Sequence, residues 1–304
     1  MTELVAVFAP SPQLTVTVED LDGAPDIHLH AGGQGVWQSR MISSLGAEVV
    51  LIAALGGETG EVLRNLVGVE LKVLDVAARN GAYVHDRRAG ERESLVEMPA
   101  DHLSRHELDD LYELALVECL RAEVAVLSGP NDDVVPDDVY RRLTADLRGQ
   151  GRDVVVDLSG GRLAAALEGG PTVVKVSHDE LVEDGRSKSD AEEDLVAAMR
   201  EIAECGARAV VVSRASEPTL ALIGSRLLRV TAPGLSTVDT KGGGDSMTAG
   251  LAAGLALGID LEEALRLGAA AGSLNVTRHG LGTGGGEAVE ELAARVDLRV
   301  VEGE

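Results

Sequence analysis

Lysine and long apolar runs are scarce in this chain. Only four of its 304 residues are lysine, at positions 72, 175, 188 and 241, so a lysine beside a motif carries more weight than usual. The apolar runs are short and interrupted by charges, and the first residues, MTELVAVF, form neither a basic n-region nor a cleavable apolar segment. We therefore expect a cytoplasmic protein.

Positive charge and cysteine are also in short supply. The formal net charge of −24 leaves no room for the basic surface that nucleic acid or an anionic membrane would require, so we expect neither as a partner. The two cysteines, Cys119 and Cys205, lie far apart in segments of helical period and match no metal or redox spacing. We expect both to be buried thiols.

Apolar β-branched runs alternate with segments of helical period, a pattern typical of a mainly parallel sheet covered by helices on both faces. The clearest runs are residues 48–55, 123–127, 153–158, 172–176 and 209–213. A capping box at Ser104 and Glu107 predicts a helix that runs to about Leu120, and Pro136 lies in the first turn of another. The length suits one main domain, so we expect a single α/β domain over residues 1–304.

Two segments interrupt this alternation. Residues 81–98 are strand-like, charged and rich in turn residues, and residues 14–30 are polar and strand-like, which together predict a small β lid. Nearer the C-terminus, residues 219–223 and 226–230 flank Gly224-Ser225, a two-residue hairpin signal. That hairpin predicts an antiparallel extension of the main sheet.

The strongest motif is VDTKGGGDSMTAG at residues 238–250. Gly242, Gly243 and Gly244 allow positive φ and can bring consecutive N–H groups around an anion, where the dipole of the following helix also favours negative charge. Beside a bound γ-phosphate, Asp245 could accept the proton of an attacking hydroxyl. An isolated GGGD is more often a turn whose aspartate caps the helix, so that alternative stays open.

A second glycine cluster, AGGQG at residues 31–35, opens a helix with the apolar stripe Trp37, Met41 and Leu45. Its backbone amides could meet a substrate oxygen, although a plain turn explains the cluster equally well. The spacing G-x-x-x-x-G-K-[ST] is absent from the chain, which excludes a P-loop.

Taken together, these segments resemble the phosphofructokinase-B branch of the ribokinase-like carbohydrate kinases over almost the whole chain. The segments that carry the resemblance are AGGQG, LGAEVVLIAALGGETG, Ser128-Gly129, VVVDLSG, VVKVSHDE, STVDTKGGGDSMTAG and LEEALRLGAAAGSLNVTRHGLGT, in that order. The resemblance implies a ribokinase-like α/β fold, with a central, mostly parallel sheet, helices on both faces and a small β lid over the sugar. It also allows a homodimer formed through the lid.

The activity implied is ATP-dependent transfer of the γ-phosphoryl group, with Mg²⁺, to a hydroxyl of a sugar or sugar phosphate, as in phosphofructokinase or tagatose-phosphate kinase. By position, Gly242, Gly243 and Gly244 resemble the family's anion hole and Asp245 its catalytic base. The residues implied for ATP are Lys175, Ser213, Thr240, Gly280 and Gly282, with Glu180 facing a magnesium ion through water. Those implied for the sugar are Ser11, Thr15, Gly32, Gly33, Gln34 and Trp37.

The sequence departs from the family pattern where the sugar should bind. The family's N-P-x-x-D segment, whose aspartate grips sugar hydroxyls, reads SPQLT at residues 11–15, and Gln34 and Trp37 replace a lysine and an asparagine. Ser177 replaces the asparagine of N-x-x-E, and residues 213–217 lack the usual glycines. Two alternatives therefore stay open: a kinase for another small acceptor such as a nucleoside, and a non-catalytic sugar- or nucleotide-binding regulatory paralogue.

For several charged residues an ordinary role competes with a functional one. Glu180 could be a solvated helix cap, Lys241 a surface lysine, and Lys175 is an unusual charge near the end of an apolar strand. His28 and His30 are expected to be ordinary strand positions. Four arginines of the predicted hairpin could hold a substrate phosphate, but an exposed hairpin favours solvated side chains: Arg79, Arg87, Arg88 and Arg92.

Overall fold

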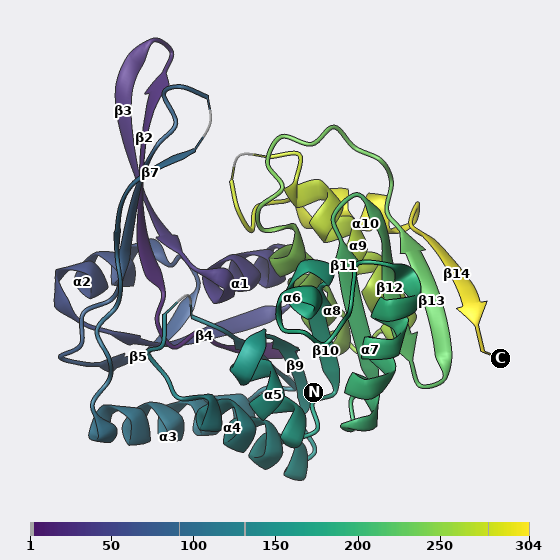
Figure 1. Cartoon of the computed structure of the whole chain (residues 1–304). Helices are drawn as coiled ribbons and strands as arrows, with labels where there is room; N and C mark the ends of the chain where they lie inside the picture. Colours follow the sequence, from purple (N-terminus) through teal and green to yellow (C-terminus); the bar gives the residue numbers. More distant parts are fainter. Residues whose placement is uncertain (1–2, 91, 131, 279, 304) are drawn as a thin grey trace.

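Two β-sheets organise the chain in the computed structural model, which describes residues 3–90, 92–130, 132–278 and 280–303 (Figure 1). The main sheet has ten strands in the order β14-β13-β12-β11-β10-β9-β8-β1-β4-β5. Their bounds are β1 (Leu4–Phe8), β4 (Glu48–Leu55), β5 (Glu70–Asp75), β8 (Val124–Ser128), β9 (Asp153–Asp157), β10 (Val173–Ser177), β11 (Ala209–Arg214), β12 (Glu217–Ile223), β13 (Arg226–Thr231) and β14 (Asp297–Glu302).

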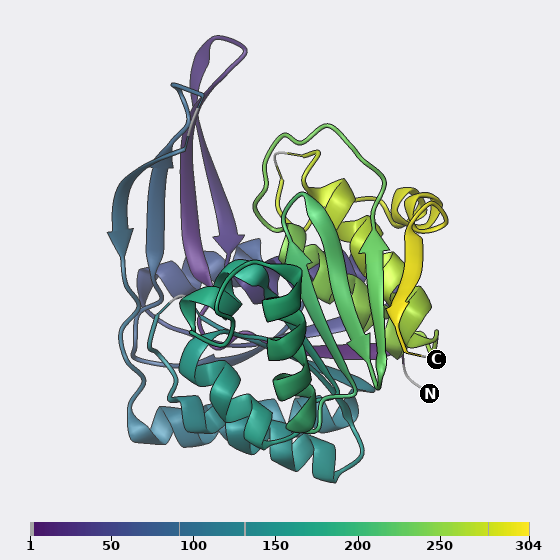
Figure 2. The same cartoon turned by 45° about the vertical axis from the view of Figure 1, so that its right-hand side comes forward.

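Strands β5 to β11 of this order pair in parallel, and β11 to β14 pair antiparallel. The expected strand at 48–55 has the observed bounds of β4, and the other four central strands shift by about a residue at one or both ends. The turn Gly224-Ser225 joins β12 to β13, which confirms the antiparallel extension. Figure 2 shows the strands of this extension, in green and yellow, next to the helices.

Helices cover both faces of the main sheet because alternate side chains of each strand point to opposite faces. On β1, Val5 and Val7 join one buried core, and Ala6 and Phe8 join the other. The first core contains α1 (Gln34–Ser44), α2 (Gly57–Leu66), α8 (Gly243–Ala256), α9 (Leu261–Asn275) and α10 (Gly286–Ala293). The second contains α3 (Arg105–Arg121), α4 (Asp137–Gly149), α5 (Gly160–Glu168), α6 (His178–Glu183) and α7 (Glu192–Glu204).

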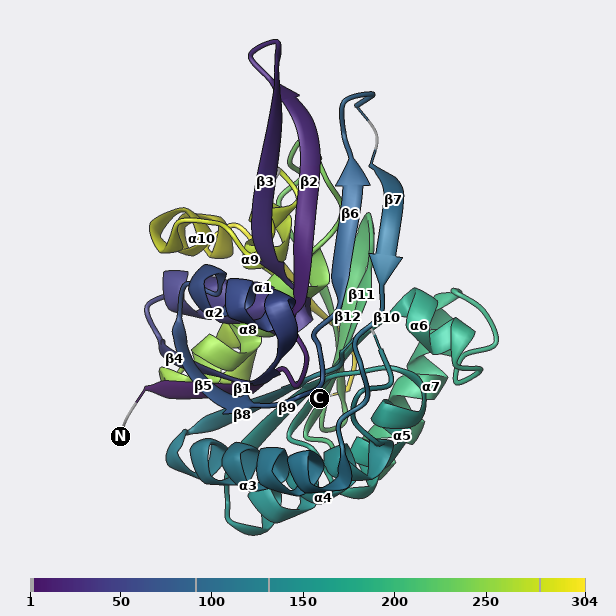
Figure 3. The same ribbon diagram turned by 90° about the vertical axis from the view of Figure 1, so that its left-hand side faces the viewer.

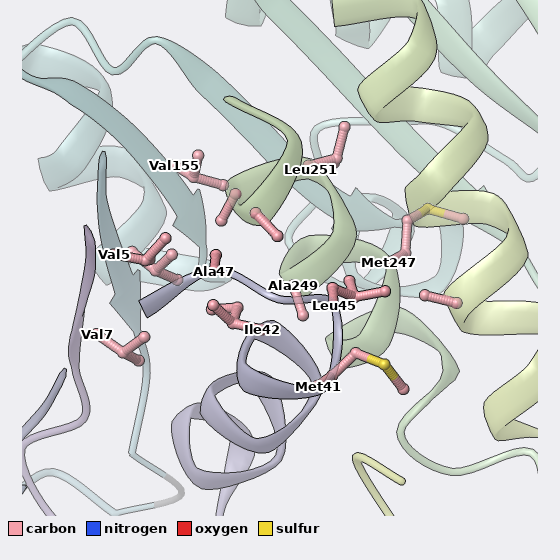
Figure 4. Close-up of a cluster of buried hydrophobic side chains, with 14 of the residues drawn as sticks. Val5, Val7, Met41, Ile42, Leu45, Ala47, Val155, Met247, Ala249 and Leu251 are labelled. Atoms are coloured by element: carbon pink, nitrogen blue, oxygen red, sulfur yellow. The ribbon is translucent and has the colours of Figure 1, made fainter. Parts of the chain in front are cut away.

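Helix α8 lies at the centre of the first core. Figure 4 shows its side chains Met247, Ala249 and Leu251 among residues of β1, β9 and α1. A Cβ added to Gly250 would lie 2.5 Å from the Cα of Gly268 on α9, so the two helices approach at backbone distance. Close packing of this kind holds the loop at the start of α8 in one position.

The smaller sheet rises away from the main body (Figures 1 and 3) and has the order β3-β2-β6-β7. Its strands are β2 (Gln13–Leu21), β3 (Ala24–Gly32), β6 (Ala82–Asp86) and β7 (Glu93–Met98), which come from the two segments expected to form a lid. By strand alternation, one face carries Thr15, Thr17, His85 and their neighbours, and the opposite face carries Ile27 and Leu29.

Of the remaining sequence expectations, the structure confirms the helix cap at Ser104 and contradicts the burial of Cys205. Ser104 and Glu107 form the capping box of α3, as expected. Cys119 is buried, but the expectation of a second buried thiol is wrong, since Cys205 is exposed at the C-cap of α7, just after the helix ends at Glu204. Within the described residues, no helix is long and apolar enough to cross a membrane.

Candidate active site

The glycine loop ends directly at the start of α8. Gly242 is the N-cap residue with φ +74°, in the left-handed region that favours glycine. A Cβ on Gly243 would lie 3.1 Å from the side chain of Val276, and a Cβ on Gly244 would lie 2.5 Å from Lys175 Nζ. Glycine is therefore required for the close approach of this loop to α9 and to the buried lysine.

Asn275, at the end of α9, ties the glycine loop to a second turn. Its Nδ2 donates to the carbonyl oxygen of Lys241 at 2.8 Å, and its Oδ1 accepts from the N–H of Gly282 at 2.9 Å. Gly282 has φ +64°, and a Cβ there would collide with the backbone of Trp37 on α1. Asn275 is fully buried and was not predicted as a site residue. In the sequence, the signal for Asn275 was its position as a polar residue at the end of a long apolar helix.

Asp245 lies in the first turn of α8. Burial raises the pKa of Asp245 to about 7, and the negative charge of Asp157 adds to the shift, against the opposing effects of Lys175 and a hydrogen bond from Gln34. A carboxylate with a pKa near neutral can take up a proton and release it again at physiological pH, which is the property a general base needs.

Lys175 lies on β10, buried beneath the glycine loop. Its Nζ donates to Asp157 Oδ1 at 3.2 Å, and both side chains are almost fully buried. Burial disfavours the ammonium form, but Asp157, Asp245 and Glu180 outweigh that effect and raise the pKa of Lys175. Lys175 therefore stays charged and adds a fixed positive charge under Gly244.

Asp157, at the end of β9, had no role in the sequence prediction. Its Oδ2 accepts from Gln38 Nε2 at 2.9 Å and from Thr248 Oγ1 at 2.6 Å. The Ser128 hydroxyl in turn donates to Gln38. Gln38, Thr248 and Ser128 lie on three elements far apart in the sequence, α1, α8 and β8, so local spacing could not reveal them. The only sequence signal was an acid that ends an apolar strand.

A pocket opens beside Asp245 at the start of α1. It is lined by residues 9–13, 33–36, 81, 129, 130 and 132. Gln34 Oε1 accepts from the N–H of Gly129 at 3.2 Å, and the Gln34 amide also hydrogen-bonds Asp245. Of the six residues predicted to hold the sugar, Ser11, Gly33 and Gln34 line this pocket.

The other three predicted sugar residues lie around the pocket. Thr15, on β2, pairs with His30 and has its hydroxyl against Gly32, where a Cβ would come within 2.5 Å. Trp37 contacts the Gly282 turn through its backbone. Asn80, which was not predicted, fixes the segment before β2: its Nδ2 donates to the carbonyl oxygen of Pro12 at 3.3 Å and of Ala54 at 3.0 Å.

The predicted nucleotide residues are spread along the same edge of the sheet. Ser213 lies on β11 opposite Ser177, one residue before the strand ends at Arg214, and Thr240 and Gly280 are exposed in loops. Glu180 forms a capping box at α6, where its Oε2 accepts from the Ser177 N–H at 2.7 Å and hydroxyl at 2.8 Å. Its charge nevertheless acts on Asp157, Lys175 and Asp245, so it belongs to the same electrostatic cluster.

Within the part of the chain that the structure describes, the acidic side chains of this site are not close enough together to share one metal ion. Among the described residues, the one group of acids and histidines close enough to share an ion is Glu19, Asp26 and His28 on the smaller sheet. There His28 Nε2 already lies 3.0 Å from a Glu19 oxygen and 2.8 Å from an Asp26 oxygen, so these side chains contact one another directly.

The hairpin between β6 and β7 reaches the loop before α8. Arg87 Nη2 donates to Asp239 Oδ2 at 2.9 Å, and Arg92 lies 4.0 Å from the same oxygen. The expectation that the hairpin arginines are solvated is therefore wrong for these two, because the hairpin folds over the loop. It holds for Arg88, which is 53% exposed and pairs with Asp86.

A glycine loop at a helix N-terminus, a carboxylate with a near-neutral pKa and a buried lysine lie together on a doubly covered, mostly parallel sheet, an arrangement whose chemistry suits phosphoryl transfer. Residues 5–286 match the pfkB family carbohydrate kinases, and the chain belongs to this family. Its fold is ribokinase-like, and it is a phosphotransferase that acts on a sugar hydroxyl.

Three known proteins illustrate the similarity. The chain is 28% identical to a 1-phosphofructokinase of Bacillus subtilis (strain 168) over 95% of its own length and 96% of the relative's. It is 33% identical to the ATP-dependent 6-phosphofructokinase isozyme 2 of Escherichia coli (strain K12), over 82% of each chain. The solved phosphofructokinase-2 of Escherichia coli with potassium superposes with a TM-score of 0.85 at 27% identity, covering 97% and 99% of the two chains.

Proposed function

We propose that this protein transfers the γ-phosphoryl group of ATP to a hydroxyl of a sugar phosphate. The observation that carries the proposal is the position of Asp245, with a pKa near 7, beside Gly244 and above the ammonium group of Lys175. The relatives that resemble the chain over most of its length act on fructose phosphates, which supports a phosphorylated ketose as the acceptor class.

Each group of the site is proposed to have a separate role in the reaction. The acceptor oxygen attacks the γ-phosphorus, the bond from that phosphorus to the bridging oxygen of ADP breaks, and the hydroxyl proton moves to the Asp245 carboxylate. The N–H groups of Gly242, Gly243 and Gly244 face the charge that develops on the transferred group. Lys175, fixed by Asp157 at 3.2 Å, adds positive charge at the same point.

The nucleotide is proposed to lie along Ser213, Thr240, Gly280 and Gly282, at the edge of the sheet that also holds Lys175. Glu180 would hold Mg²⁺ through water, which suits an ion that keeps part of its hydration shell and is bound largely by nucleotide phosphates. The ion supplies charge neutralisation for those phosphates. The absence of a preformed acidic cage in the described part of the site is consistent with this arrangement.

The smaller sheet is proposed to act both as a lid over the acceptor and as a contact between two copies of the chain. The polar face of this sheet turns toward the glycine loop through Arg87. On the opposite face, Ile27, Leu29 and Val96 are 64%, 49% and 57% exposed. A second copy would cover this apolar face. One relative, phosphofructokinase-2 of Escherichia coli, has been solved as a tetramer. We further propose that residues 1–304 work as one domain in the cytoplasm.

An acceptor screen tests the proposed function. ADP release with MgATP is measured for fructose 1-phosphate, fructose 6-phosphate, tagatose 6-phosphate, free hexoses and nucleosides. We expect a ketose phosphate to give the highest kcat/KM. Preference for a nucleoside would contradict the proposed acceptor, and binding of a sugar phosphate or ATP by calorimetry without any ADP release would indicate a regulatory binder.

A further inference from the structure

Helix α1 presents two glutamine side chains to the carboxylates of the site. Gln34 and Gln38 are four residues apart and therefore lie on the same face of the helix. Gln34 lines the pocket and hydrogen-bonds Asp245. Gln38 lies deeper, with no exposed surface, and its Nε2 donates to Asp157 Oδ2 at 2.9 Å. Each of these two carboxyl groups thus has an amide donor from the same helix.

The end of β8 fixes the direction in which both amides point. Gln34 Oε1 accepts from the N–H of Gly129 at 3.2 Å, and Gln38 Oε1 accepts from the Ser128 hydroxyl. An amide whose oxygen is held by a donor turns its NH₂ group the other way, here toward a carboxyl group. The Tyr140 hydroxyl donates to the carbonyl oxygen of Ser128 at 3.2 Å and supports this arrangement. The protein alone therefore orients Gln38, without a bound acceptor.

Asp157 receives three side-chain hydrogen bonds on its two oxygens. Oδ2 accepts from Gln38 and Thr248, and Oδ1 accepts from Lys175 at 3.2 Å. Burial favours the neutral carboxyl group and raises the pKa of Asp157, against the opposing effects of Lys175 and Thr248. Each donor stabilises the ionised form, so the removal of any one of them makes Asp157 easier to protonate.

The charge of Asp157 acts on the groups that meet the phosphates and the acceptor. Three charged residues from three elements interact with Asp157: Lys175 on β10, Glu180 on α6 and Asp245 on α8. Ionised Asp157 holds the Lys175 ammonium group in place and opposes a negative charge on Asp245. Neutral Asp157 would do neither. Because Asp157 is only 1% exposed, its effect on the reaction passes through these neighbours.

We propose that Gln38 is a positioning residue of the reaction, which keeps Asp157 ionised beside Lys175 and thereby holds the lysine and Asp245 in the charge states that phosphoryl transfer needs. The proposal rests on the proposed function and adds a residue that is buried away from both substrates. A side chain without a donor at position 38 would leave Thr248 as the one printed partner of Oδ2 within the described residues.

Gln38→Met tests the proposal, because methionine has a similar length and volume but no hydrogen-bond donor. We expect kcat at pH 8 to fall about 10- to 100-fold, the range that a lost hydrogen bond to a charged group gives. KM for ATP and for the best acceptor of the screen should stay within about three-fold. The acid limb of kcat/KM should move to lower pH by about one unit, because neutral Asp157 no longer raises the pKa of Asp245.

Ser39→Ala is the matched control. The Ser39 hydroxyl is equally buried on α1 and donates to the carbonyl oxygen of Gly35 at 2.7 Å, so the variant loses a buried hydrogen bond that does not involve Asp157. It should keep the wild-type acid limb. Thr248→Val removes the other donor to Oδ2 and should shift the limb in the same direction as Gln38→Met. Because both act through one carboxyl group, their effects should not add in the double variant.

The position of the acid limb decides the outcome. An unmoved limb in Gln38→Met, whatever the change in kcat, would mean that Gln38 only fills space in the core. A shift to higher pH would contradict the role assigned to Asp157. If Gln38→Met does not fold, Ser128→Ala takes its place, since it removes the hydroxyl that orients the Gln38 amide. A limb at lower pH in this variant supports the proposal, and an unmoved limb overturns it.

A carbon-13 NMR titration of the aspartate carboxyl groups separates this proposal from the proposed function, because it needs no turnover. The Asp245 signal is identified by its absence from Asp245→Asn. If no sugar phosphate is phosphorylated but Asp245 titrates about one pH unit lower in Gln38→Met than in wild type, the function fails and the control of Asp245 by Gln38 stands. If turnover is efficient and Asp245 titrates alike in both proteins, the positioning role fails and the function stands.

Discussion

Replacement of Asp245 by asparagine is the most direct test of the mechanism. The amide has nearly the same size and can keep the hydrogen bond with Gln34, but it cannot accept the acceptor's proton. Removal of a general base costs about 10²- to 10⁴-fold in kcat. We therefore expect Asp245→Asn to lose at least about 100-fold in kcat, measured by ADP release, while calorimetric affinity for ATP stays within a few-fold of wild type.

The pH profile gives the same prediction a second readout. Because the carboxylate must be ionised to act as the base, kcat/KM of the wild type should fall about ten-fold for each pH unit below about 7 and level off above it. The residual activity of Asp245→Asn should lack this dependence. Asp179→Asn, which removes a carboxylate that is 76% exposed near the same edge of the sheet, is the control and should keep the wild-type profile.

Stability should change in the opposite direction to activity. The pKa of Asp245 is raised from 3.8 to about 7 on folding, so its favourable contribution is present below pH 3.8 and is lost as the pH rises through 7. Asparagine has no charge to bury. The variant should thus unfold at a higher temperature than wild type at pH 8, and the difference should shrink toward pH 4. Activity within a few-fold of wild type, or a lower melting temperature at pH 8, would refute the reasoning about this residue.

Three further predictions follow from the same contacts. Gly244→Ala should lower kcat more than the affinity for ATP, because the new Cβ would push on the buried Lys175 Nζ and misdirect the N–H groups; an effect on KM for ATP alone would contradict this. Gly282→Ala should lower the melting temperature by several degrees through its positive φ and the collision with Trp37, and an unchanged melting curve would count against it. Fructose phosphates should be turned over below about 10⁴ M⁻¹s⁻¹ by wild type, and Thr15→Asp, which restores the family's acid, should raise kcat/KM about ten-fold or more; efficient wild-type turnover would show that the missing acid is compensated.

The fold could be predicted from local patterns because its determinants are local. The run at 48–55 is apolar at almost every position, as a parallel strand buried on both faces requires, and the capping box at Ser104 marks the start of α3. The exposure of Cys205 could not be predicted in this way. By helical period Cys205 would continue the buried series of Leu195, Met199 and Ile202, but the period does not show that α7 ends at Glu204.

From residue types alone the site was predictable only where it is contiguous in the sequence, whereas Lys175, Gln34 and Gly282 were expected there from the family resemblance. The glycines and Asp245 stand in one motif, so their geometry at the start of α8 follows from residue types alone. Asp157 and Asn275 act through partners that are distant in the chain, such as Thr248 for the first and Gly282 for the second. No spacing rule connects those positions, and only the packing of α8 against α9 and the sheet brings them together.

The prediction that the hairpin arginines are exposed is wrong for Arg87 and Arg92 but correct for Arg88. A charged hairpin with several turn residues normally lies in water, and Arg88 does. Arg87 is turned inward because it follows His85 by two positions and therefore shares the polar face of the sheet. Its partner, Asp239, is far away in the sequence. Alternation continued from β6 could have predicted that Arg87 and Arg88 point to opposite faces of the sheet. Only the structure shows that Arg87 pairs with Asp239 in the loop before α8.

The pocket at the start of α1 and the arginines of the β6–β7 hairpin have a common consequence for the acceptor. The segment that lacks the family's acid is held by the protein itself, with Asn80 Nδ2 3.5 Å from the Ser11 hydroxyl. The Gln34 amide is likewise occupied by Gly129 and Asp245. Few strong partners thus remain for ring hydroxyls, whereas the positive charge of Arg92 and its neighbours is only partly neutralised. Recognition of the acceptor should therefore depend more on its phosphate than on the stereochemistry of its ring, so that epimeric ketose phosphates differ little in KM while loss of the phosphate costs far more.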